Sequence, residues 1–307
     1  MRRIGFRHQR TLAAPAVVRG VGIVTGIPVT LRFVPAPVDT GLVFARTDLA
    51  YRPTTPAVAD RVTGTNRRTT LGDAHSGVTL VEHVLSALAG LRIDNCTIEL
   101  DAIEPPGLDG SALGYVQALN RAGSVLQSSR RPIYAPTEPI TVEQNGAVIT
   151  LHPPEPHLAM TFRAGYILDY GPQAHIPRQV FTMNVTPGNY VRDVAACRTF
   201  LLEVEAEQLR KEGVGRHLSA SEVLVFGPRG PIDNVLRHAD EPARHKVLDM
   251  IGDLALCGFD IVGHAAAYRS GHALNAALAL ELMDRAAMRS EAVVPTRVSL
   301  PRSRRAA

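Results

Sequence analysis

Three side chains that can bind cations or protons recur at one-turn intervals in the segment from Arg244 to Asp253. His245, Asp249 and Asp253 stand at positions i, i+4 and i+8. Residues four apart on an α-helix share one face, so these side chains would lie one above another. An imidazole and a carboxylate one turn apart can bind a single divalent cation, and zinc accepts both ligand types. The spacing alone also fits a solvated polar face with a hydrogen bond between histidine and aspartate.

The dipeptide Glu82-His83 offers a third ligand, in the first turn of a helix predicted over residues 79–91. If His83 joined His245 and Asp249, three protein ligands would leave a fourth position open, as in catalytic zinc sites. Glu82 could then take a proton from the water at the metal. The alternative is a capping box, in which Glu82 pairs with the threonine three residues earlier and His83 is an ordinary histidine.

His272 is the third candidate for chemistry. It stands in the segment Ser270-Gly-His-Ala-Leu-Asn275, between a predicted strand and a predicted helix. A histidine at that point could protonate a leaving amine; the alternative is an ordinary loop histidine. The chain has 11 histidines, and those other than His83, His245 and His272 lack a comparable carboxylate spacing and receive no role.

The elements that must carry these residues follow from hydrophobic periodicity. Apolar residues at helical spacing, ending in a glycine, predict the helix over 79–91. Pro242 suits the first turn of a helix and Gly258 its end, so the residues from His245 to Asp253 share one helix. The same criteria predict the remaining elements: a hairpin over 19–33 with its turn at Thr25-Gly26, helices over 112–122 and 199–211, and strands over 93–100, 223–226 and 260–268.

Two pairs of segments repeat in the same order along the chain. Residues 28–37 resemble residues 147–156, with an offset of 120 when Thr30-Leu31 is set on Thr150-Leu151, and residues 87–93 resemble residues 255–261 at an offset of 168. In both copies the later of the two segments, 87–93 or 255–261, joins a predicted helix end, a glycine and a strand start, which is one supersecondary unit. The sequence therefore predicts an α+β fold of two copies of one unit. The difference between the offsets places an insertion of 48 residues at about 181–234.

The predicted domains are residues 1–128 and 129–292. A polar, proline-containing linker is expected around 127–139, and the arginine-rich tail, 293–307, is expected to be disordered. We expect selectivity for the substrate to come from the insertion in the second domain, because functional groups concentrate on loops carried by a rigid frame.

Composition excludes several classes of protein. The 307 residues are 45% hydrophobic and 20% charged, which is typical of a globular chain and of neither a disordered nor a collagen-like one. Without an apolar run of about 18 residues, a membrane-spanning or secreted protein is not expected. Cys96, Cys197 and Cys257 form no Cys-x-x-Cys pair, which argues against a disulfide framework and predicts a reducing, cytoplasmic location.

The charge balance bears on partners. The net charge is +4, aromatic residues make up 5% and tryptophan is absent, so nucleic-acid binding is not expected. A mild basic excess still suits phosphates or peripheral contact with the inner membrane surface. No obligate protein partner is evident.

Five motifs together resemble the zinc-dependent UDP-3-O-acyl-N-acetylglucosamine deacetylases of lipid A biosynthesis. They span nearly the whole chain in the order of that family: Val81-Glu-His83, Asp109-Gly-Ser-Ala112, Arg198-Thr-Phe200, His245-Lys-Val-Leu-Asp249 with Gly252-Asp253, and Ser270-Gly-His-Ala-Leu-Asn275. The resemblance implies two domains, each a two-layer α/β sandwich, with the active site between them.

The resemblance also implies a role for each site residue. His83, His245 and Asp249 would be the ligands of Zn²⁺, and Glu82 the general base. His272 would be the charged partner and general acid for the departing amine. Three further roles are implied for Asp253, which would orient His272, for Thr199, which would stabilise the oxyanion together with zinc, and for Lys246, which would lie near the developing charge or a substrate phosphate.

The implied substrate is a UDP-glucosamine with an ester-linked hydroxyacyl chain, hydrolysed at its 2-acetamido group to give acetate and the free amine. The chain departs from the family pattern at Leu201, where a glycine is usual, and in the stretch 213–227, which lacks the usual Gly-Gly pair. Acyl length and identity therefore stay open, as do the oligomeric state and the choice between zinc and iron or cobalt. Two alternative functions are a diverged zinc amidohydrolase acting on another N-acetylated sugar and an inactive protein that binds an anionic lipid or a nucleotide.

Overall fold

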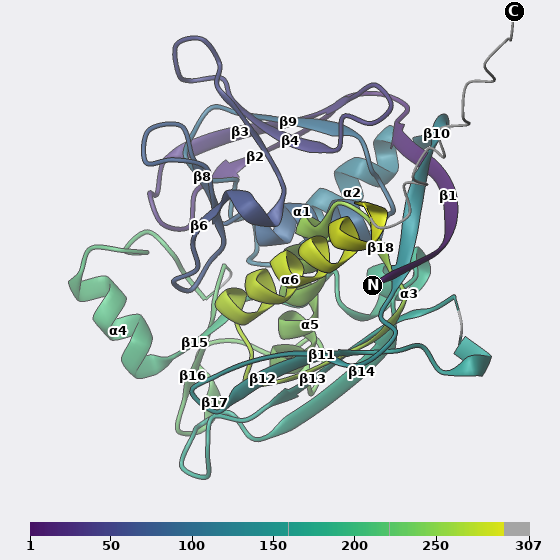
Figure 1. Cartoon of the computed structure of the whole chain (residues 1–307). Coiled ribbons are helices and arrows are strands. Elements are labelled where there is room, and N and C mark those ends of the chain that lie inside the picture. Colours follow the sequence, from purple (N-terminus) through teal and green to yellow (C-terminus); the bar gives the residue numbers. More distant parts are fainter. Residues whose placement is uncertain (159, 221, 292–307) are drawn as a thin grey trace, which may run out of the picture.

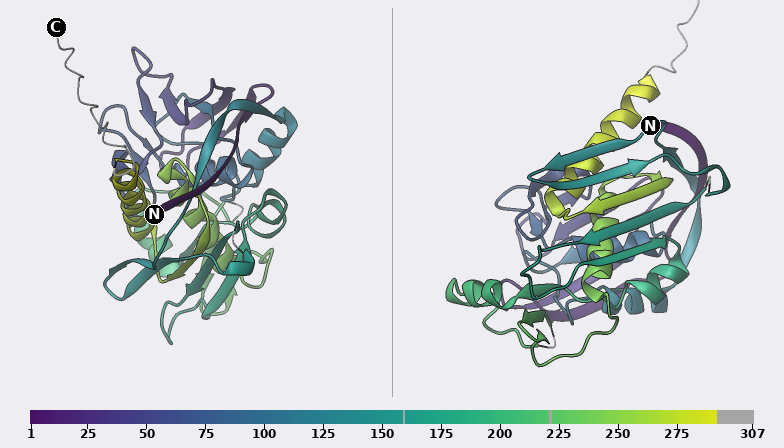
Figure 2. Two further views of the ribbon diagram at one scale, coloured as in Figure 1. Left: turned by 45° about the vertical axis from the view of Figure 1, so that its right-hand side comes forward. Right: turned by 90° about the horizontal axis from the view of Figure 1, so that it is seen from below.

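Helices fill the space between two five-stranded sheets (Figure 1). The computed structural model of the chain describes residues 1–158, 160–220 and 222–291, so the tail predicted to be disordered lies outside the described residues. The sheets and helices together form a mixed α and β architecture, as the α+β prediction requires. Two further views show the two sheets on opposite sides of the helices (Figure 2).

The first sheet comes from the first part of the chain and has the strand order β2-β3-β9-β4-β5. Its strands are β2 (Ala16–Val21), β3 (Pro28–Pro35), β4 (Leu42–Arg46), β5 (Thr54–Pro56) and β9 (Cys96–Leu100). The hairpin predicted over 19–33 is confirmed, because β2 and β3 pair antiparallel around a turn in which Gly26 has a φ of 70°. Leu31 and Phe33 of β3 are fully buried and alternate with exposed or half-buried residues.

The second sheet has the order β11-β12-β19-β13-β14. Its strands are β11 (Ile140–Gln144), β12 (Ala147–His152), β13 (Phe162–Leu168), β14 (Gln179–Asn184) and β19 (Gly263–Tyr268). Its neighbouring strands pair antiparallel, antiparallel, parallel and antiparallel, which is the same sequence of directions as in the first sheet. Residues 181–184 belong to β14, so the start of the expected insertion forms part of this sheet.

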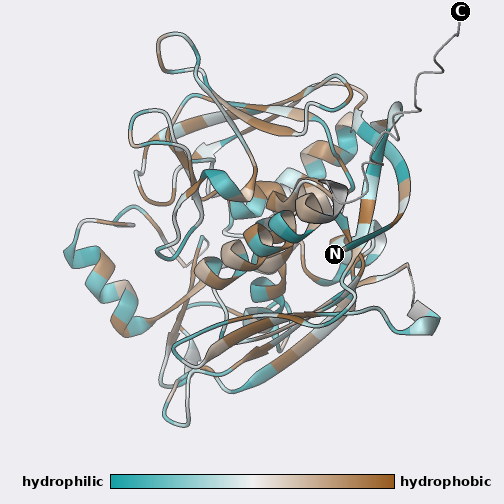
Figure 3. Cartoon of the chain, viewed as in Figure 1, coloured by the Kyte–Doolittle hydropathy of each residue, from teal (hydrophilic) through white to brown (hydrophobic). Residues whose placement is uncertain are grey.

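Four helices pack between the sheets: α1 (Glu82–Gly90), α2 (Leu113–Ala122), α5 (Glu241–Leu254) and α6 (His272–Glu291). Hydrophobic and hydrophilic residues alternate along the strands, as expected for sheets with one buried face (Figure 3). Leu85 and Leu88 of α1 and Leu248 of α5 are fully buried, so the core lies where these helices meet. Among the described residues, no helix is long and apolar enough to cross a bilayer.

The expected linker is a strand instead. Residues 124–135 form β10 (Ser124–Ala135), which pairs with β1 (Arg2–Leu12) and with β18 (Asp260–Ile261) in a three-stranded sheet. The polar residues and prolines of this segment indicated a linker, but the segment forms a strand. Pro132 lies opposite Phe6 in the strand pair, and a proline is tolerated at a strand position where no ladder hydrogen bond needs its missing N–H.

The remaining elements lie outside the two large sheets. They are the small sheet of β6 (Val62–Gly64), β7 (Thr70–Leu71) and β8 (Val78–Thr79), the segment with α3 (Pro187–Asp193), β15 (Phe200–Leu202), α4 (Glu203–Lys211), β16 (Leu224–Gly227) and β17 (Gly230–Pro231), and the 3₁₀ turns η1 (Ala59–Arg61), η2 (Pro156–Leu158) and η3 (Ala255–Cys257). The helix predicted over 199–211 begins only at Glu203, because Phe200–Leu202 pairs with β16. Figure 1 shows α4 projecting from the body of the molecule.

Candidate metal centre and acid-base groups

Two helices from different halves of the sequence bring three potential metal ligands together. His83 lies in the first turn of α1, and His245 and Asp249 lie one turn apart on α5. One ligand atom from each of the three lies within 4.8 Å of the other two. All three side chains are buried. Two imidazoles and a carboxylate at this separation form a donor set that suits zinc.

A glycine allows the two helices to approach so closely. A Cβ atom at Gly252 of α5 would overlap the carbonyl oxygen of Glu82 and would lie 3.1 Å from the amide nitrogen of Ser86, both in α1. The Ser86 hydroxyl donates a hydrogen bond of 2.7 Å to the carbonyl of Leu248 across the same contact. The first turn of α1 therefore lies directly against the C-terminal half of α5.

One carboxylate oxygen of Asp249 faces both imidazoles. Its Oδ1 lies 3.2 Å from Nε2 of His245 and 3.5 Å from Nε2 of His83. Among the described residues this buried oxygen has no hydrogen-bond partner. The other oxygen, Oδ2, accepts a hydrogen bond of 2.7 Å from Nζ of Lys246. A buried carboxylate oxygen without a donor is costly, and a cation between these three atoms would satisfy it.

Burial and charge prepare the α5 ligands for a cation. Burial lowers the pKa of His245 to about 4, against the opposing charge of Asp249, so this imidazole is neutral at neutral pH. Burial disfavours the ionised form of Asp249, but its interactions with His245 and with the Lys246 ammonium outweigh burial and hold the pKa of Asp249 well below its usual value. The ring nitrogen Nδ1 of His245 lies 3.0 Å from the carbonyl oxygen of Cys197. That contact orients the ring so that Nε2 faces the site.

Glu82 is held by a residue that the sequence did not single out. The amide of Thr69 donates a hydrogen bond of 3.0 Å to Oε2 of Glu82. The capping-box alternative is wrong, because Val81 is the N-cap of α1, and Thr79 lies in β8, where it pairs with Thr70 of β7. Burial raises the pKa of Glu82 above its ordinary value, while the charges of His272 and His83 oppose the rise.

His272 and Asp253 form a buried acid-base pair near Glu82. Nδ1 of His272 lies 3.0 Å from Oδ2 of Asp253, and the same oxygen accepts a hydrogen bond of 2.9 Å from the side-chain amide of Asn275. Burial alone would lower the pKa of His272. The charges of Asp253 and Glu82 outweigh burial and raise it to about 9, so the imidazole carries a proton at neutral pH.

Thr199 follows a residue that forms a buried ion pair with α5. Its neighbour Arg198 forms an ion pair of 2.9 Å with Glu241, the first residue of α5, and both side chains are buried. The backbone amide of Thr199 donates a hydrogen bond of 2.8 Å to the carbonyl of Gly110. The segment that supplies Thr199 is therefore fixed to α5 and to the first half of the chain.

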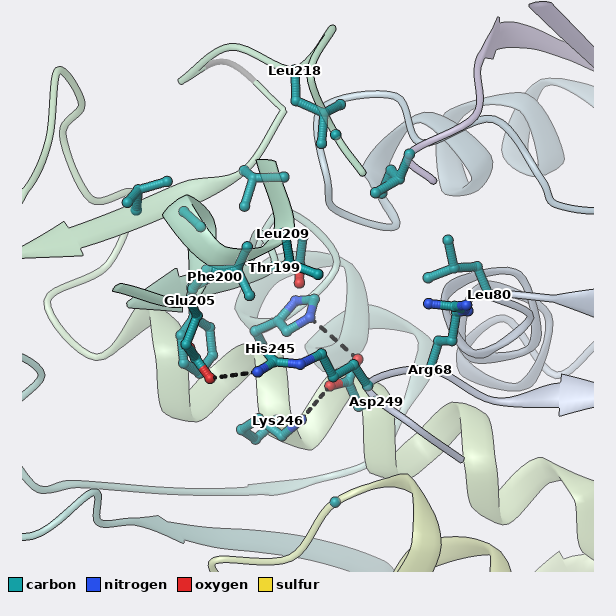
Figure 4. Close-up of a pocket in the computed structure, with 18 of the residues that line it drawn as sticks. Arg68, Leu80, Thr199, Phe200, Glu205, Leu209, Leu218, His245, Lys246 and Asp249 are labelled. Atoms are coloured by element: carbon teal, nitrogen blue, oxygen red, sulfur yellow. Dashed lines mark hydrogen bonds and ion pairs between the residues drawn. The ribbon is translucent and has the colours of Figure 1, made fainter. Parts of the chain in front are cut away.

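The three proposed ligands and the side chains nearest to them line one cavity of about 880 Å³. Glu82, His83, His272 and Thr199 are among its lining residues, and Figure 4 shows His245, Lys246 and Asp249 on α5 with Thr199 and Phe200 beside them. Apolar side chains from the segment between β14 and α5 line another part of the same cavity: Leu209, Val214, Leu218, Val223 and Ile232. A polar centre is thus continuous with an apolar recess.

The structure brings together every site residue predicted from the sequence. It also adds groups that the sequence analysis did not assign: Thr69, Asn275, the carbonyl of Cys197, and the pair of Arg198 and Glu241. Arg198 and Asn275 stand inside recognised motifs, which was the available signal for them. Thr69 stands in a loop ahead of β7, and no spacing in the sequence points to it.

The chain matches a family model described as UDP-3-O-acyl N-acetylglycosamine deacetylase over residues 9–284. Three similar proteins carry the name UDP-3-O-acyl-N-acetylglucosamine deacetylase. The one from Solibacter usitatus is 38% identical over 280 residues, covering 91% of this chain and 92% of that protein. The one from Thermosynechococcus vestitus is 39% identical over 271 residues, covering 88% and 92%, and the one from Myxococcus xanthus is 36% identical over 282 residues, covering 90% and 86%.

Proposed function

Because the chain belongs to the UDP-3-O-acyl-N-acetylglucosamine deacetylase family, the hydrolases of lipid A biosynthesis, we propose that it removes the N-acetyl group of an acylated UDP-N-acetylglucosamine. Water and the acetamide give acetate and the free amine. The single observation that carries this proposal is the juxtaposition in one cavity of the His83, His245 and Asp249 donors with Glu82 and His272.

We propose Zn²⁺ as the ion for the three donors. The unpartnered Oδ1 of Asp249 and the neutral state of His245 both suit a bound cation. A zinc ion held there would act as a Lewis acid toward the attacking water and the acetamide carbonyl. The ammonium group of Lys246 donates a hydrogen bond to Oδ2 of Asp249, one of the three proposed ligands. Lys246 would therefore contact the developing charge on the substrate while it stays paired with Asp249.

The acid and base roles are assigned to two residues that line the cavity, Glu82 and His272. Glu82 accepts the proton of the attacking water, since its raised pKa makes it a stronger base than a free carboxylate. His272 gives its proton to the amine nitrogen as the carbon–nitrogen bond breaks, and Asp253 orients that imidazole. Thr199 lines the same cavity, and we assign it to the oxyanion of the tetrahedral intermediate.

We assign the apolar recess to the hydroxyacyl chain of the substrate. Side chains such as Leu209 and Leu218 supply the apolar surface that an alkyl chain needs. Leu201 also lines the cavity, and a leucine takes more room than the glycine usual in the family. We therefore expect acyl selectivity to depend on this position.

We further propose that residues 1–128 and 129–292 are duplicated two-layer α/β sandwich domains with the active site between them. The matching sequence of strand directions in the two large sheets supports this. The extra residues of the second copy then extend from the end of β14 to about 234. A cytoplasmic location is proposed as well, supported by three buried free cysteines.

Metal content and acetate release, measured in one preparation, test the function. We expect about one zinc per chain and acetate from the acylated UDP-sugar, with far less from unacylated UDP-N-acetylglucosamine. The variant His83→Ala is expected to lose both the metal and the activity. Acetate from the unacylated sugar alone would favour a diverged amidohydrolase. No acetate from either sugar by a zinc-loaded preparation would favour a binding protein.

A further inference from the structure

Thr69 connects the two carboxylates that flank the reaction centre. Its backbone amide donates to Oε2 of Glu82 at 3.0 Å, and its hydroxyl donates to Oδ1 of Asp253 at 2.6 Å. Asp253 uses its other oxygen for His272. One residue thus contacts the proposed general base directly and the proposed general acid through a single intermediary.

The contact joins groups that are far apart in sequence and sealed from water. Thr69 and Asp253 are 184 residues apart, and both are fully buried. The Thr69 amide gives Glu82 the one hydrogen bond that this carboxylate accepts from the described residues. Two buried carboxylates repel each other, so a donor placed between them fixes their separation and their orientation.

The loop before β7 is built to hold Thr69 in place. Thr70 and Leu71 pair with β8, and Nε of Arg68 donates to the Thr79 hydroxyl at 2.9 Å. The turn ahead of them contains Arg67 with a φ of 60°. Thr69 itself does not appear among the cavity-lining residues, although Arg67 and Arg68 do. It therefore lies behind the reacting groups.

From these contacts we propose that Thr69 is a positioning residue that sets the relative placement of Glu82 and His272. The inference rests on the proposed function, which supplies the base and acid roles. The amide contact fixes Glu82, and the hydroxyl contact fixes Asp253 and, through it, the imidazole. Loss of the hydroxyl should lower the rate of the chemical step and leave binding of substrate and metal intact.

The test compares Thr69→Val, which keeps the shape and the amide but loses the hydroxyl, with Thr69→Ser, which keeps the hydroxyl. In the valine variant we expect kcat to fall between about tenfold and a hundredfold, with KM and zinc content within about twofold of the parent. The serine variant should keep at least about half of the parental kcat. If the valine variant does not fold, Thr69→Cys replaces it, since a thiol is a weak donor.

Thr70→Val is the matched control. It removes a neighbouring hydroxyl that contacts Thr79 at 2.8 Å and touches neither carboxylate, so its kcat should equal that of the parent. A Thr69→Val enzyme with parental kcat would overturn the inference. So would a serine variant that loses as much as the valine variant, because the methyl group and not the hydroxyl would then matter.

A crystal structure of Thr69→Val tests the placement without any turnover. We expect the Asp253 carboxylate or the His272 ring to move by about 0.5 Å or more, beyond the tolerance of a preorganised site. Unchanged positions of both groups would contradict the inference. Absence of acetate release by the parent enzyme would instead count against the proposed function, and the crystallographic comparison would still decide the role of Thr69.

Discussion

His272 and Asp253 form a buried pair whose stabilising effect depends on pH. The pKa of His272 is raised from 6.5 to about 9 in the folded chain, so folding favours its protonated form. The contribution is therefore fully present below the unfolded pKa of 6.5 and is lost as the pH rises through about 9. Removal of the imidazole should thus be more costly at low pH than at high pH.

The first prediction concerns this pH dependence. The difference in unfolding free energy between the parent and His272→Gln should shrink by roughly 3 kcal/mol between pH 6 and pH 10. Denaturant titrations at several pH values would measure it. In an Asp253→Asn background, which removes the largest charge that raises this pKa, the dependence should be much weaker. An equal difference at all pH values would argue against the protonated pair.

The second prediction concerns the proposed base. Glu82→Ala should keep zinc, because Glu82 is not one of the three donors, but its kcat should fall by about a hundredfold or more. Metal analysis together with acetate release provides the measurement. Glu143→Ala, at an exposed position of β11, is the control and should behave as the parent. A parental rate in the Glu82 variant would remove this residue from the mechanism.

At the residue scale, the sequence predicted the groups that have a characteristic spacing or stand in a motif. His245 and Asp249 were found because one helical turn separates them. Thr69 was not, because its hydroxyl contact with Asp253 depends on how a loop of the first half meets α5 of the second. No sequence pattern distinguishes Thr69 from any other threonine in a loop.

At the element scale, the close contact of α1 and α5 creates the metal centre. The contact depends on the absence of a side chain at Gly252, since a Cβ there would overlap the carbonyl oxygen of Glu82. Backbone atoms within a helix cannot move away as a flexible side chain could. An added methyl group must therefore push the helices apart.

The third prediction is that Gly252→Ala lowers the unfolding free energy by about 1–3 kcal/mol through overpacking and weakens zinc binding. Gly188→Ala is the matched control, because its Cβ would meet open space, and alanine is the better helix former. Thermal unfolding and zinc titration of both variants would measure the effects. Unchanged zinc affinity in the Gly252 variant would show that the helix contact does not position the ligands.

Helices and strands were predicted well where their periodicity was strong, as for α1, α5 and the β2–β3 hairpin. The segment that forms β10 was interpreted as a linker because it is polar and contains proline. Its pairing partner β1 lies at the other end of the first half, and such non-local pairing leaves little trace in a local pattern. The start of α1 was misplaced for the same reason, because Thr79 pairs with β7.

At the scale of the whole molecule, two arginines and two carboxylates connect the two halves of the chain. Arg7 in β1 donates to Asp94 at 2.7 Å and to Asp260 at 2.8 Å. Asp94 precedes β9 of the first sheet, and Asp260 begins β18, which leads to the second. Arg131 in β10 reaches Asp260 at 2.8 Å and Asp94 at 3.3 Å. Two carboxylates and two guanidinium groups thus form one network between the halves.

The fourth prediction is that Arg7→Leu lowers the unfolding free energy by about 3 kcal/mol, because Asp94 is left buried with less compensating charge. Urea titration would measure the loss. Arg32→Leu removes an exposed ion pair with Glu99 and should cost less than about 1 kcal/mol. Equal losses of unfolding free energy in the two variants would show that the network between the halves stabilises the protein no more than an exposed ion pair does.

The pairing of β1, β10 and β18 has a consequence for attempts to divide the protein. A fragment that starts near residue 129 would lack β1 and the beginning of β10, and the rest of β10 would present an unsatisfied edge. We expect such a piece to aggregate when it is produced alone. Co-production with residues 1–128 should rescue it, because the severed polypeptides could then reassemble around the shared strand.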